Sequence, residues 1–576
     1  MEENRLNEQT TEKNTAVADA DLLKCSEIRD GEFVRYYGKK AEVTIPASVT
    51  IIAEDAFRGN RNVTRVILGE NVHTVGTNAF RDCVSLRQVV FPTGLTELGT
   101  GAFEGCRSLA AALLPRTLQY IGDACFRGCS ELKYVLLSAS LRRLGRMAFS
   151  DCTALEELQL PEGLDAIHRA TFFNCRSLRH LTIPEKVQSV GRYAFARCDS
   201  LASLELPEGL TYLGSGAFSE CRSLQQMRLP GKIRFIGDYT FSCCSSLEAL
   251  EVPPELSYIG NAALCACKKL KDFHLPEGLT RIGNSAFLHC TALEEVKIPG
   301  TVQDVSRMAF AYCTALREVK MDAPLTLIES STFIECISLK SIVLPATVRE
   351  VEEKAFSGCT SLTSVRLPRE LAELGDHAFE GCSSLCSVSL PVHLRKTGDG
   401  VFADCKALQT VIFPDTRIRF GRGLFVGCPA LEVVVAADCQ PLSGRRRTKL
   451  GIGEQVQVIQ HSELRLVLSF VELNDPETTE ERRAELRPEI RRALERIRRR
   501  NRRYATATLR ENLTRVTEVA IEEQTRLENE KAEEAVAETA SEPASEPAGE
   551  PVTADVAAET AKTEKNEKNE KNEKGE

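Results

Sequence analysis

The sequence predicts a solenoid, a stack of short coils that each add one strand to a curved parallel sheet. Three observations lead to this prediction. A phenylalanine recurs every 23 residues from Phe57 to Phe425, with Leu264 at one of the seventeen positions. No insertion or deletion interrupts the period, and the apolar positions within each copy keep the same spacing. A fixed period of roughly 20 to 50 residues is typical of repeat proteins in which each unit stacks on its neighbours.

The strand of each copy is predicted eight to eleven residues after the phenylalanine. In the copy that starts at Phe149, polar and apolar residues alternate there, as in a strand with one buried face. Pro161 follows and ends the strand, because proline cannot donate a ladder hydrogen bond. Strands of successive copies should lie parallel, about 4.8 Å apart. A single copy cannot bury a core by itself, so its stability must come from stacked neighbours.

The return path of each copy is predicted to hold tight turns. A glycine stands nineteen residues after the phenylalanine in many copies, as at Gly122 and Gly214, where a left-handed or crowded backbone is tolerated. A small residue, mostly alanine, precedes each phenylalanine. We therefore expect a tight helical turn on the side of the coil opposite the strand.

The repeated pattern Leu-x-x-Val/Leu-x-Leu-Pro, then Leu-x-x-Ile-Gly-x-x-Ala-Phe-x-x-Cys, resembles the BspA-like class of 23-residue leucine-rich repeats. The resemblance covers residues 43–437. The plain leucine-rich repeat has Asn or Cys after its strand, whereas this chain has Gly163 or Lys186 there and places its cysteine before the strand. The resemblance implies a leucine-rich-repeat solenoid with a protein-binding or adhesive role, and microbial surface proteins are common in that class.

The 22 cysteines indicate a packing role. Sixteen of them stand three residues after the repeat position, from Cys83 to Cys428. Neighbouring copies would bring their Cα atoms about 5 Å apart, which disulfide geometry allows, but free cysteine is also a common small core residue. The first residues, 1–7, contain no apolar run, and no apolar stretch of about 18 residues follows. We therefore expect reduced thiols, no membrane span and a cytoplasmic protein, with the cell surface as the alternative.

Five segments are predicted along the chain. Residues 1–30 are expected to be polar and disordered, and 31–439 to form the solenoid of about 17 full repeats. A basic linker at 440–455 should precede a mostly helical capping region at 456–534. Residues 535–576 are rich in Glu, Ala, Lys and Pro, a composition that cannot bury a core, so a disordered tail is expected.

The capping region contains an arginine-rich segment. Leu486, Ile490, Leu494 and Ile497 form one apolar stripe, opposed by eleven arginines between Arg482 and Arg503. Such a face can bind nucleic acid or another acidic surface. Interleaved glutamates and the lack of an aromatic platform favour a solvated face instead.

No catalytic or metal-binding motif is recognisable in the sequence. The eight histidines fall at unrelated repeat positions, and no metal-ligand, phosphate-loop or nucleophile motif occurs. We expect no catalytic residues, no cofactor, no metal and no small-molecule substrate. The chain is therefore interpreted as non-enzymatic.

A candidate partner site lies on the exposed face of the predicted strands. The position ten residues after each phenylalanine should face solvent along a concave sheet, and in the first four copies it is apolar. A contiguous exposed apolar patch usually marks an interaction site. The candidate residues are Ile67, Val90, Leu113, Tyr134 and Leu136. The alternative is that the N-terminal segment covers this patch.

The function predicted from the sequence is a protein–protein interaction scaffold that binds a protein partner through the concave face of the solenoid. The first alternative is a microbial cell-surface adhesin of the BspA-like type. The second is a nucleic-acid-associated scaffold that uses the arginine-rich segment, although a nucleic-acid partner is disfavoured.

Overall fold

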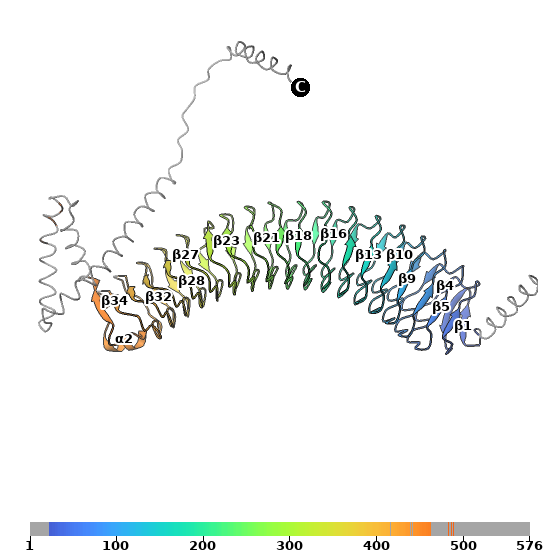
Figure 1. Ribbon diagram of the computed structural model, residues 1–576, viewed down its shortest axis with the longest axis horizontal. Coiled ribbons are helices and arrows are strands. Elements are labelled where there is room, and N and C mark those ends of the chain that lie inside the picture. Colours follow the sequence, from blue (N-terminus) through green and yellow to red (C-terminus); the bar gives the residue numbers. More distant parts are fainter. Residues whose placement is uncertain are drawn as a thin grey trace, which may run out of the picture. The chain divides into compact units, whose positions relative to one another are not determined.

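The computed structural model describes Leu22, residues 24–414, 416–437, 439–440 and 442–461, and the isolated positions Arg482, Glu485 and Pro488. The chain divides into two units, Met1–Arg465 and Leu466–Glu576. The solenoid lies in the first unit, where the coils stack in chain order along an arc (Figure 1). Apart from those three isolated positions, the predicted arginine-rich helix and the tail lie outside the described residues, as do residues 1–21.

Most coils carry a strand of three or four residues that begins about eight residues after the repeat phenylalanine; the coils of Phe195 and Leu264 have none. We call these strands the long-strand row. They are β3 (Glu42–Thr44), β5 (Arg65–Ile67), β7 (Gln88–Val90), β9 (Ala111–Leu113), β11 (Tyr134–Leu136), β13 (Glu157–Gln159), β15 (His180–Thr182), β18 (Gln226–Arg228), β20 (Ala249–Glu251), β23 (Glu295–Ile298), β25 (Glu318–Met321), β27 (Ser341–Val343), β29 (Ser364–Arg366), β31 (Ser387–Ser389), β33 (Thr410–Ile412), β34 (Val433–Ala436) and β35 (Gln457–Gln460).

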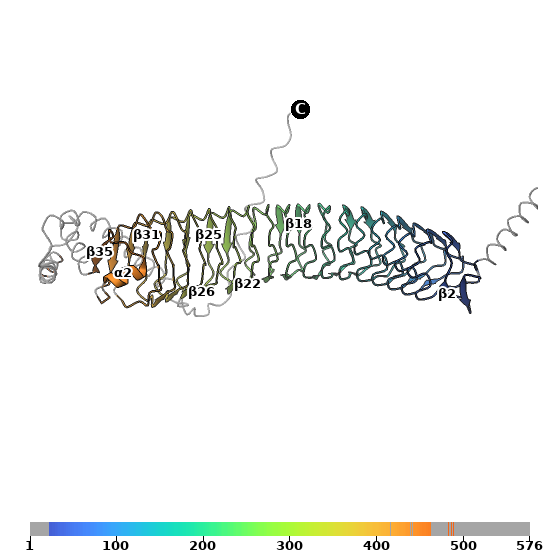
Figure 2. The ribbon, with the colours of Figure 1, turned by 90° about the horizontal axis from the view of Figure 1, so that it is seen from below.

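Each coil also carries a second strand of two residues, so the prediction of one strand per repeat is wrong. We call these strands the short-strand row. They are β4 (Ile51–Ile52), β6 (Thr74–Val75), β8 (Glu97–Leu98), β10 (Tyr120–Ile121), β12 (Arg143–Leu144), β14 (Ala166–Ile167), β16 (Ser189–Val190), β17 (Tyr212–Leu213), β19 (Phe235–Ile236), β21 (Tyr258–Ile259), β22 (Arg281–Ile282), β24 (Asp304–Val305), β26 (Leu327–Ile328), β28 (Glu350–Val351), β30 (Glu373–Leu374) and β32 (Lys396–Thr397). Figure 2 shows the two rows along opposite long edges.

Both rows are parallel ladders in a register of one full repeat. Leu113 pairs with Leu136 in the long-strand row, and Ile121 pairs with Leu144 in the short-strand row, each 23 residues on. A glycine follows the short strand in most coils and permits this close stacking. A Cβ on Gly122 would lie 2.5 Å from the backbone of Gly99 in the preceding coil. The requirement at this position is therefore space, since the φ of Gly122 lies outside the left-handed region.

The third side of the coil, around the phenylalanine, is a ladder of turns. The expected helical turns are not confirmed, because alternate N–H groups leave the local turn and bond to the next coil. Phe149 N–H donates to the carbonyl of Thr171, at 2.9 Å. The flanking residues Met147 and Asp151 have φ of 53° and 61°. This left-handed backbone costs a non-glycine residue about 1 to 2 kcal/mol, which the inter-coil hydrogen bonds must offset.

The phenylalanines form the centre of the core. Ten rings from Phe33 to Phe241 stack with centroids 4.7–5.9 Å apart and tilts of at most 16°. Seven more, from Phe287 to Phe425, continue the stack beyond Leu264. These rings are at most 1% exposed. Offset stacking adds about 0.5 to 1.5 kcal/mol per ring pair to the burial term.

The repeat cysteines are buried beside this stack and also donate hydrogen bonds. All sixteen thiols donate to the carbonyl oxygen of the repeat residue one coil earlier, at 3.0–3.3 Å. Cys83, for example, donates to Phe57. The cysteines of the described chain are free thiols. Their predicted core position is confirmed, and the weak S–H donor explains why a purely apolar residue does not replace cysteine there.

The N-terminal end of the solenoid is closed by a hairpin. Strands β1 (Ser26–Arg29) and β2 (Glu32–Tyr36) pair antiparallel, and β2 pairs with β4 at the start of the short-strand row. Phe33 lies on the first repeat ring, Phe57, with centroids 5.1 Å apart. The hairpin therefore extends both the sheet and the ring stack by one layer.

The chain continues past the last repeat with one further coil, in which paired residues are 24 and not 23 positions apart. Strand β34 pairs with β35, which adds one more parallel strand. Between them, helix α2 (Gly444–Leu450) occupies part of the range expected to be a basic linker, and Leu450 is fully buried. The segment 442–461 is thus packed against the last coil.

Candidate binding surface

An apolar patch is exposed at the N-terminal third of the long-strand row. Leu113 is 67% exposed, Leu136 62% and Tyr134 58%. Val90 is 37% exposed, and Ile67, at the edge of the patch, is half-buried. Large apolar side chains with this exposure on consecutive strands are unusual on a monomer surface and favour an interaction site.

Strand register brings these side chains together. Each of the five residues belongs to a long strand, and the alternation of the strand turns the intervening residues, such as Val89 and Ala112, into the core. Leu113 and Leu136 are direct cross-strand partners. Ile67 and Val90 are partners in the preceding ladder.

Basic residues border the patch. Arg65, Arg87 and Lys133 are partly or fully exposed on the same strands or immediately before them. Arg65 is paired with Glu42 at 3.7 Å. An apolar centre with a polar rim is the usual anatomy of a protein interface.

The middle of the row differs, because its charges pair with one another. Arg228 lies 3.0 Å from Glu208. Lys297 lies 3.2 Å from Asp322, and hydrogen bonding to Asp322 and then to Glu277 raises the pKa of Lys297. Exposed pairs of this kind contribute little to stability, and they present no apolar centre to a partner.

The C-terminal end of the row corrects part of the sequence prediction. Position ten was expected to face solvent in every copy, but Ile412 is 6% exposed and Val435 is fully buried. The chain beyond the last repeat accounts for this, because His461 approaches the carbonyl of Phe413 at 2.5 Å. Of the described N-terminal residues, 26–36 pair with the short-strand row and not with the apolar patch.

Exposed aromatic residues on the short-strand row were not predicted from the sequence. Tyr212 and Phe235 are 41% and 39% exposed on adjacent coils, and their rings meet edge to face at 6.2 Å. Tyr258 follows on the next coil, partly exposed. The sequence does carry a signal for them, because all three stand seventeen residues after a repeat phenylalanine, directly before a buried apolar position.

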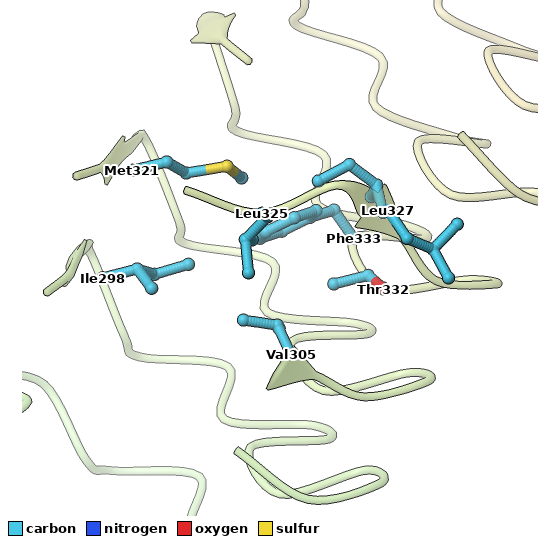
Figure 3. Close-up of a pocket in the computed structure, with 8 residues that line it drawn as sticks. Ile298, Val305, Met321, Leu325, Leu327, Thr332 and Phe333 are labelled. Carbon is cyan, nitrogen blue, oxygen red and sulfur yellow. The ribbon is translucent and has the colours of Figure 1, made fainter. Parts of the chain in front are cut away.

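The interior offers no site for a small molecule in the described part of the chain. The cavity in Figure 3 lies between two coils where Met321-Asp322 replaces the usual Leu-Pro pair. Its lining is apolar, with Met321 and Leu325 on one side and Val305 on another, and it has no room for a water molecule. No cluster of His, Cys, Asp and Glu among the described residues could hold a metal ion.

The titratable groups show no sign of catalytic activation. Burial raises the pKa of the Cys83 thiol to about 12 and that of Cys428 to about 11, which suppresses the nucleophilic thiolate. The pKa of His168 is lowered, first by burial and then by Arg143 and Arg146. These shifts follow from burial and surface charge and do not arise in a shared cleft.

Together these features define a class: a parallel β-solenoid of 23-residue leucine-rich coils, with an open apolar patch on one strand row and no enclosed site in the described residues. The BspA type leucine rich repeat region matches residues 26–155, 110–207, 188–317 and 305–432. The chain therefore belongs to the BspA type leucine rich repeat family, as the repeat pattern indicated.

Several solved structures are similar to this chain. A leucine-rich repeat protein from Bacteroides ovatus is 26% identical over 76% of this chain and 97% of that one, with a TM-score of 0.44. The T. pallidum leucine rich repeat protein is 36% identical over 31% and 86%, with a TM-score of 0.30. A leucine rich cell surface protein from Faecalibacterium prausnitzii is 22% identical over 68% and 95%, with a TM-score of 0.34.

No curated protein matches the chain. Among the described residues, no helix is both long enough and apolar enough to cross a membrane.

Proposed function

We propose that this protein is a non-enzymatic scaffold that binds a protein partner through the apolar patch of the long-strand row. The observation that carries the proposal is the run of exposed apolar residues on adjacent strands, Val90, Leu113 and Leu136, with Tyr134 beside them. With Ile67 included, the patch crosses four strands and spans about 15 Å at the strand spacing. Burial of these side chains against a partner could contribute several kcal/mol, at about 1.5 to 3 kcal/mol for each fully buried side chain.

The patch has the features of an interaction hot spot. Its apolar residues are held on paired strands, so little conformational entropy is lost when a partner binds. Tyr134 combines a large apolar ring with a hydroxyl, a residue type enriched at the centre of interfaces. The surrounding basic side chains suit a partner that carries acidic residues around an apolar centre.

The test compares what two variants of the full chain capture from a lysate. Leu113→Asp with Leu136→Asp places charges on the patch, and both side chains point away from the core, so the Tm should not change. We expect loss of the partners that wild type captures. The matched control, Glu205→Ala with Arg228→Ala, changes the same face further along and should capture normally.

Two other results would contradict the proposal. If the Asp pair lowers the Tm and exposes residues 1–40 to protease, the patch is covered by the N-terminal segment. If the Asp pair keeps its Tm and captures the same partners as wild type, the patch has no binding role.

We further propose a cytoplasmic location, which the sixteen S–H donors support, because an array of reduced thiols suits a reducing compartment. Cell fractionation tests this location. Recovery at the cell surface would favour the adhesin alternative.

A further inference from the structure

The short-strand row carries a basic cluster in its N-terminal half and an acidic cluster in its C-terminal half. Its charges therefore complement those of the same row laid in the opposite chain direction. Its exposed residues stand sixteen, seventeen, nineteen or twenty residues after a repeat phenylalanine, whereas position eighteen is buried. On the coils of Phe126, Phe149 and Phe172 these positions carry exposed arginines. The arginines are Arg142, Arg143, Arg146, Arg169 and Arg192. Asp123 lies beside this cluster and accepts a hydrogen bond from the backbone N–H of Arg146 at 2.8 Å, but no ion pair joins the five guanidinium groups to a carboxylate among the described residues.

An acidic cluster occupies the same row further along the solenoid. It lies on the coils of Phe310, Phe333 and Phe356, and its members are Glu329, Glu350, Glu352, Glu353, Glu373 and Asp376. Burial raises the pKa of Glu350, and its neighbours Glu373 and Glu352 raise it further. The acidic cluster therefore gathers like charges, and two of its members are paired within the chain, Glu353 with Lys354 and Glu373 with Lys396, each at 2.8 Å.

The two clusters are equidistant from Phe241, the midpoint between Phe57 and Phe425. The basic cluster is centred on the coil of Phe149, four repeats before Phe241, and the acidic cluster on the coil of Phe333, four repeats after it. The exposed aromatic residues Tyr212, Phe235 and Tyr258 lie between them. From the N-terminal to the C-terminal end, the row therefore presents a basic cluster, then aromatic residues, then an acidic cluster.

We propose that a second copy of this chain docks antiparallel on the short-strand row, about a two-fold axis at the coil of Phe241. In a two-fold dimer each copy uses the same surface. Because the basic and the acidic cluster are equally far from the axis, the basic cluster of each copy faces the acidic cluster of the other, and the contact occurs twice. Residues at equal repeat distances on either side of Phe241 then face each other.

The charges agree with this register along the row. The facing groups are Glu97 with Arg419 and Arg422, Asp123 with Arg395 and Lys396, Arg143 and Arg146 with Glu373 and Asp376, Arg169 with Glu350 and Glu353, Arg192 with Glu329, and Asp238 with Arg281. Asp165 faces the acidic coil, where Arg349 stands beside Glu350. Tyr258 faces itself on the axis, which gives the interface an aromatic centre.

The surface is large enough for a weak, specific dimer. From the coil of Phe80 to that of Phe402 is fourteen repeats, or about 67 Å at 4.8 Å per strand. A strip about 10 Å wide would bury about 670 Å² on each copy, within the range of specific interfaces. Because most of the contacts are exposed charge pairs, the dimer should have a dissociation constant in about the micromolar range and should weaken as salt rises.

The alternative occupant, a long polyanion such as nucleic acid, fits less well. It could bind the arginine cluster and stack on the aromatic residues, but the same row then turns acidic from Glu329 onward. A polyanion longer than the basic half would be repelled there.

The test uses the purified full chain in analytical ultracentrifugation. We expect wild type to dimerise in about 50 mM salt and to dissociate in about 500 mM salt, because screening weakens the charge pairs. Arg146→Glu with Arg169→Glu reverses two charges of the basic cluster, and Glu353→Arg with Glu373→Arg reverses two carboxylates that face them. Each variant alone should lose dimerisation by at least about tenfold in affinity.

Mixing the two variants is the decisive step. In the mixture each reversed pair faces side chains of opposite charge on the other variant, so a heterodimer should form although neither variant forms a homodimer. The matched control, Arg87→Glu with Arg179→Glu, reverses two exposed arginines near or on the long-strand row and should dimerise as wild type does. An unchanged Tm for each variant shows that folding is intact, and Arg146→Gln with Arg169→Gln replaces any reversed variant that fails to fold.

Several outcomes would overturn the proposal. These are a wild-type monomer at about 100 μM in low salt, homodimers of either reversed variant at wild-type affinity, or a mixture of the two variants that does not associate. Retention of single-stranded nucleic acid that the Arg146→Glu, Arg169→Glu variant abolishes, with wild type remaining monomeric, would assign the basic cluster to a polyanion instead.

Discussion

The break in the phenylalanine stack at Leu264 offers a sharp test of how the core is packed. Leu264 is fully buried between the coils of Phe241 and Phe287. In the same coil Phe273 stands where other copies have Leu, Val, Ile, Met or Ala, and its ring meets that of Phe287 at 5.3 Å with a tilt of 54°. We infer that Phe273 fills the space that a ring at position 264 would otherwise occupy.

If Phe273 compensates for Leu264, the stability changes of two single variants and one double variant can be predicted. Leu264→Phe alone overpacks a filled coil and should destabilise the protein by about 1 to 3 kcal/mol. Phe273→Leu alone leaves a cavity and should cost about 1 kcal/mol or more. The double change restores the consensus core and joins the two ring stacks, adding two stacked pairs of about 0.5 to 1.5 kcal/mol each. It should therefore be at least as stable as the better single variant, with a coupling of about 1 to 3 kcal/mol.

Urea unfolding of the full chain measures the three free energies, provided the dependence on urea is unchanged between variants. Amide hydrogen exchange in residues 241–287 gives a local check, because a repeat array can open one region at a time. If the double variant loses the sum of the two single effects, Leu264 and Phe273 are not a compensating pair and our interpretation of the core is wrong.

Further predictions concern the thiols and the glycine stack. In the native protein a thiol reagent should label Cys386 and Cys439 rapidly, and denaturant should release nearly all 22 thiols; a majority in disulfides would contradict the reduced core. Because burial raises the pKa of Cys83 to about 12, well above the value of about 8.5 for a thiol in the unfolded chain, stability should be full below about pH 8.5 and fall as pH rises toward 12; a flat pH profile of the Tm in that window would refute this. Gly122→Ala should lower the Tm by several degrees, since its Cβ would lie 2.5 Å from backbone, whereas Gly231→Ala, with nothing within 4 Å, should not; equal effects would argue against close coil stacking.

The repeat period made the coil, the long strand and the core positions predictable. Phe149, Cys152 and Leu158 each recur at a fixed spacing, and the structure buries all three. The short-strand row was missed because a strand of two residues has one buried position, such as Leu144, too few for an alternating pattern. The turn ladder was missed because Met147 and other bulky residues adopt positive φ there, which local preference disfavours and inter-coil hydrogen bonds impose.

The exposure of the strand surface depends on the segments that adjoin the repeats. Leu113 and Leu136 are exposed as the alternation predicts, because nothing described packs on their strands from outside. Ile412 and Val435 have the same repeat position but are buried, since the chain after the last repeat returns over them. A repeat pattern identifies which side of a strand faces outward, and neighbouring segments decide whether that side meets water.

Site-specific photocrosslinking tests the central claim most directly, namely that the apolar patch of the long-strand row is where a protein partner binds. A benzophenone amino acid is placed at position 113 in one full-length variant and at 182, on the same row three coils away, in another. Our account predicts a covalent protein adduct from position 113 that the Leu136→Asp change abolishes, and none from position 182. Adducts of equal yield from both positions, or from position 182 alone, would contradict it.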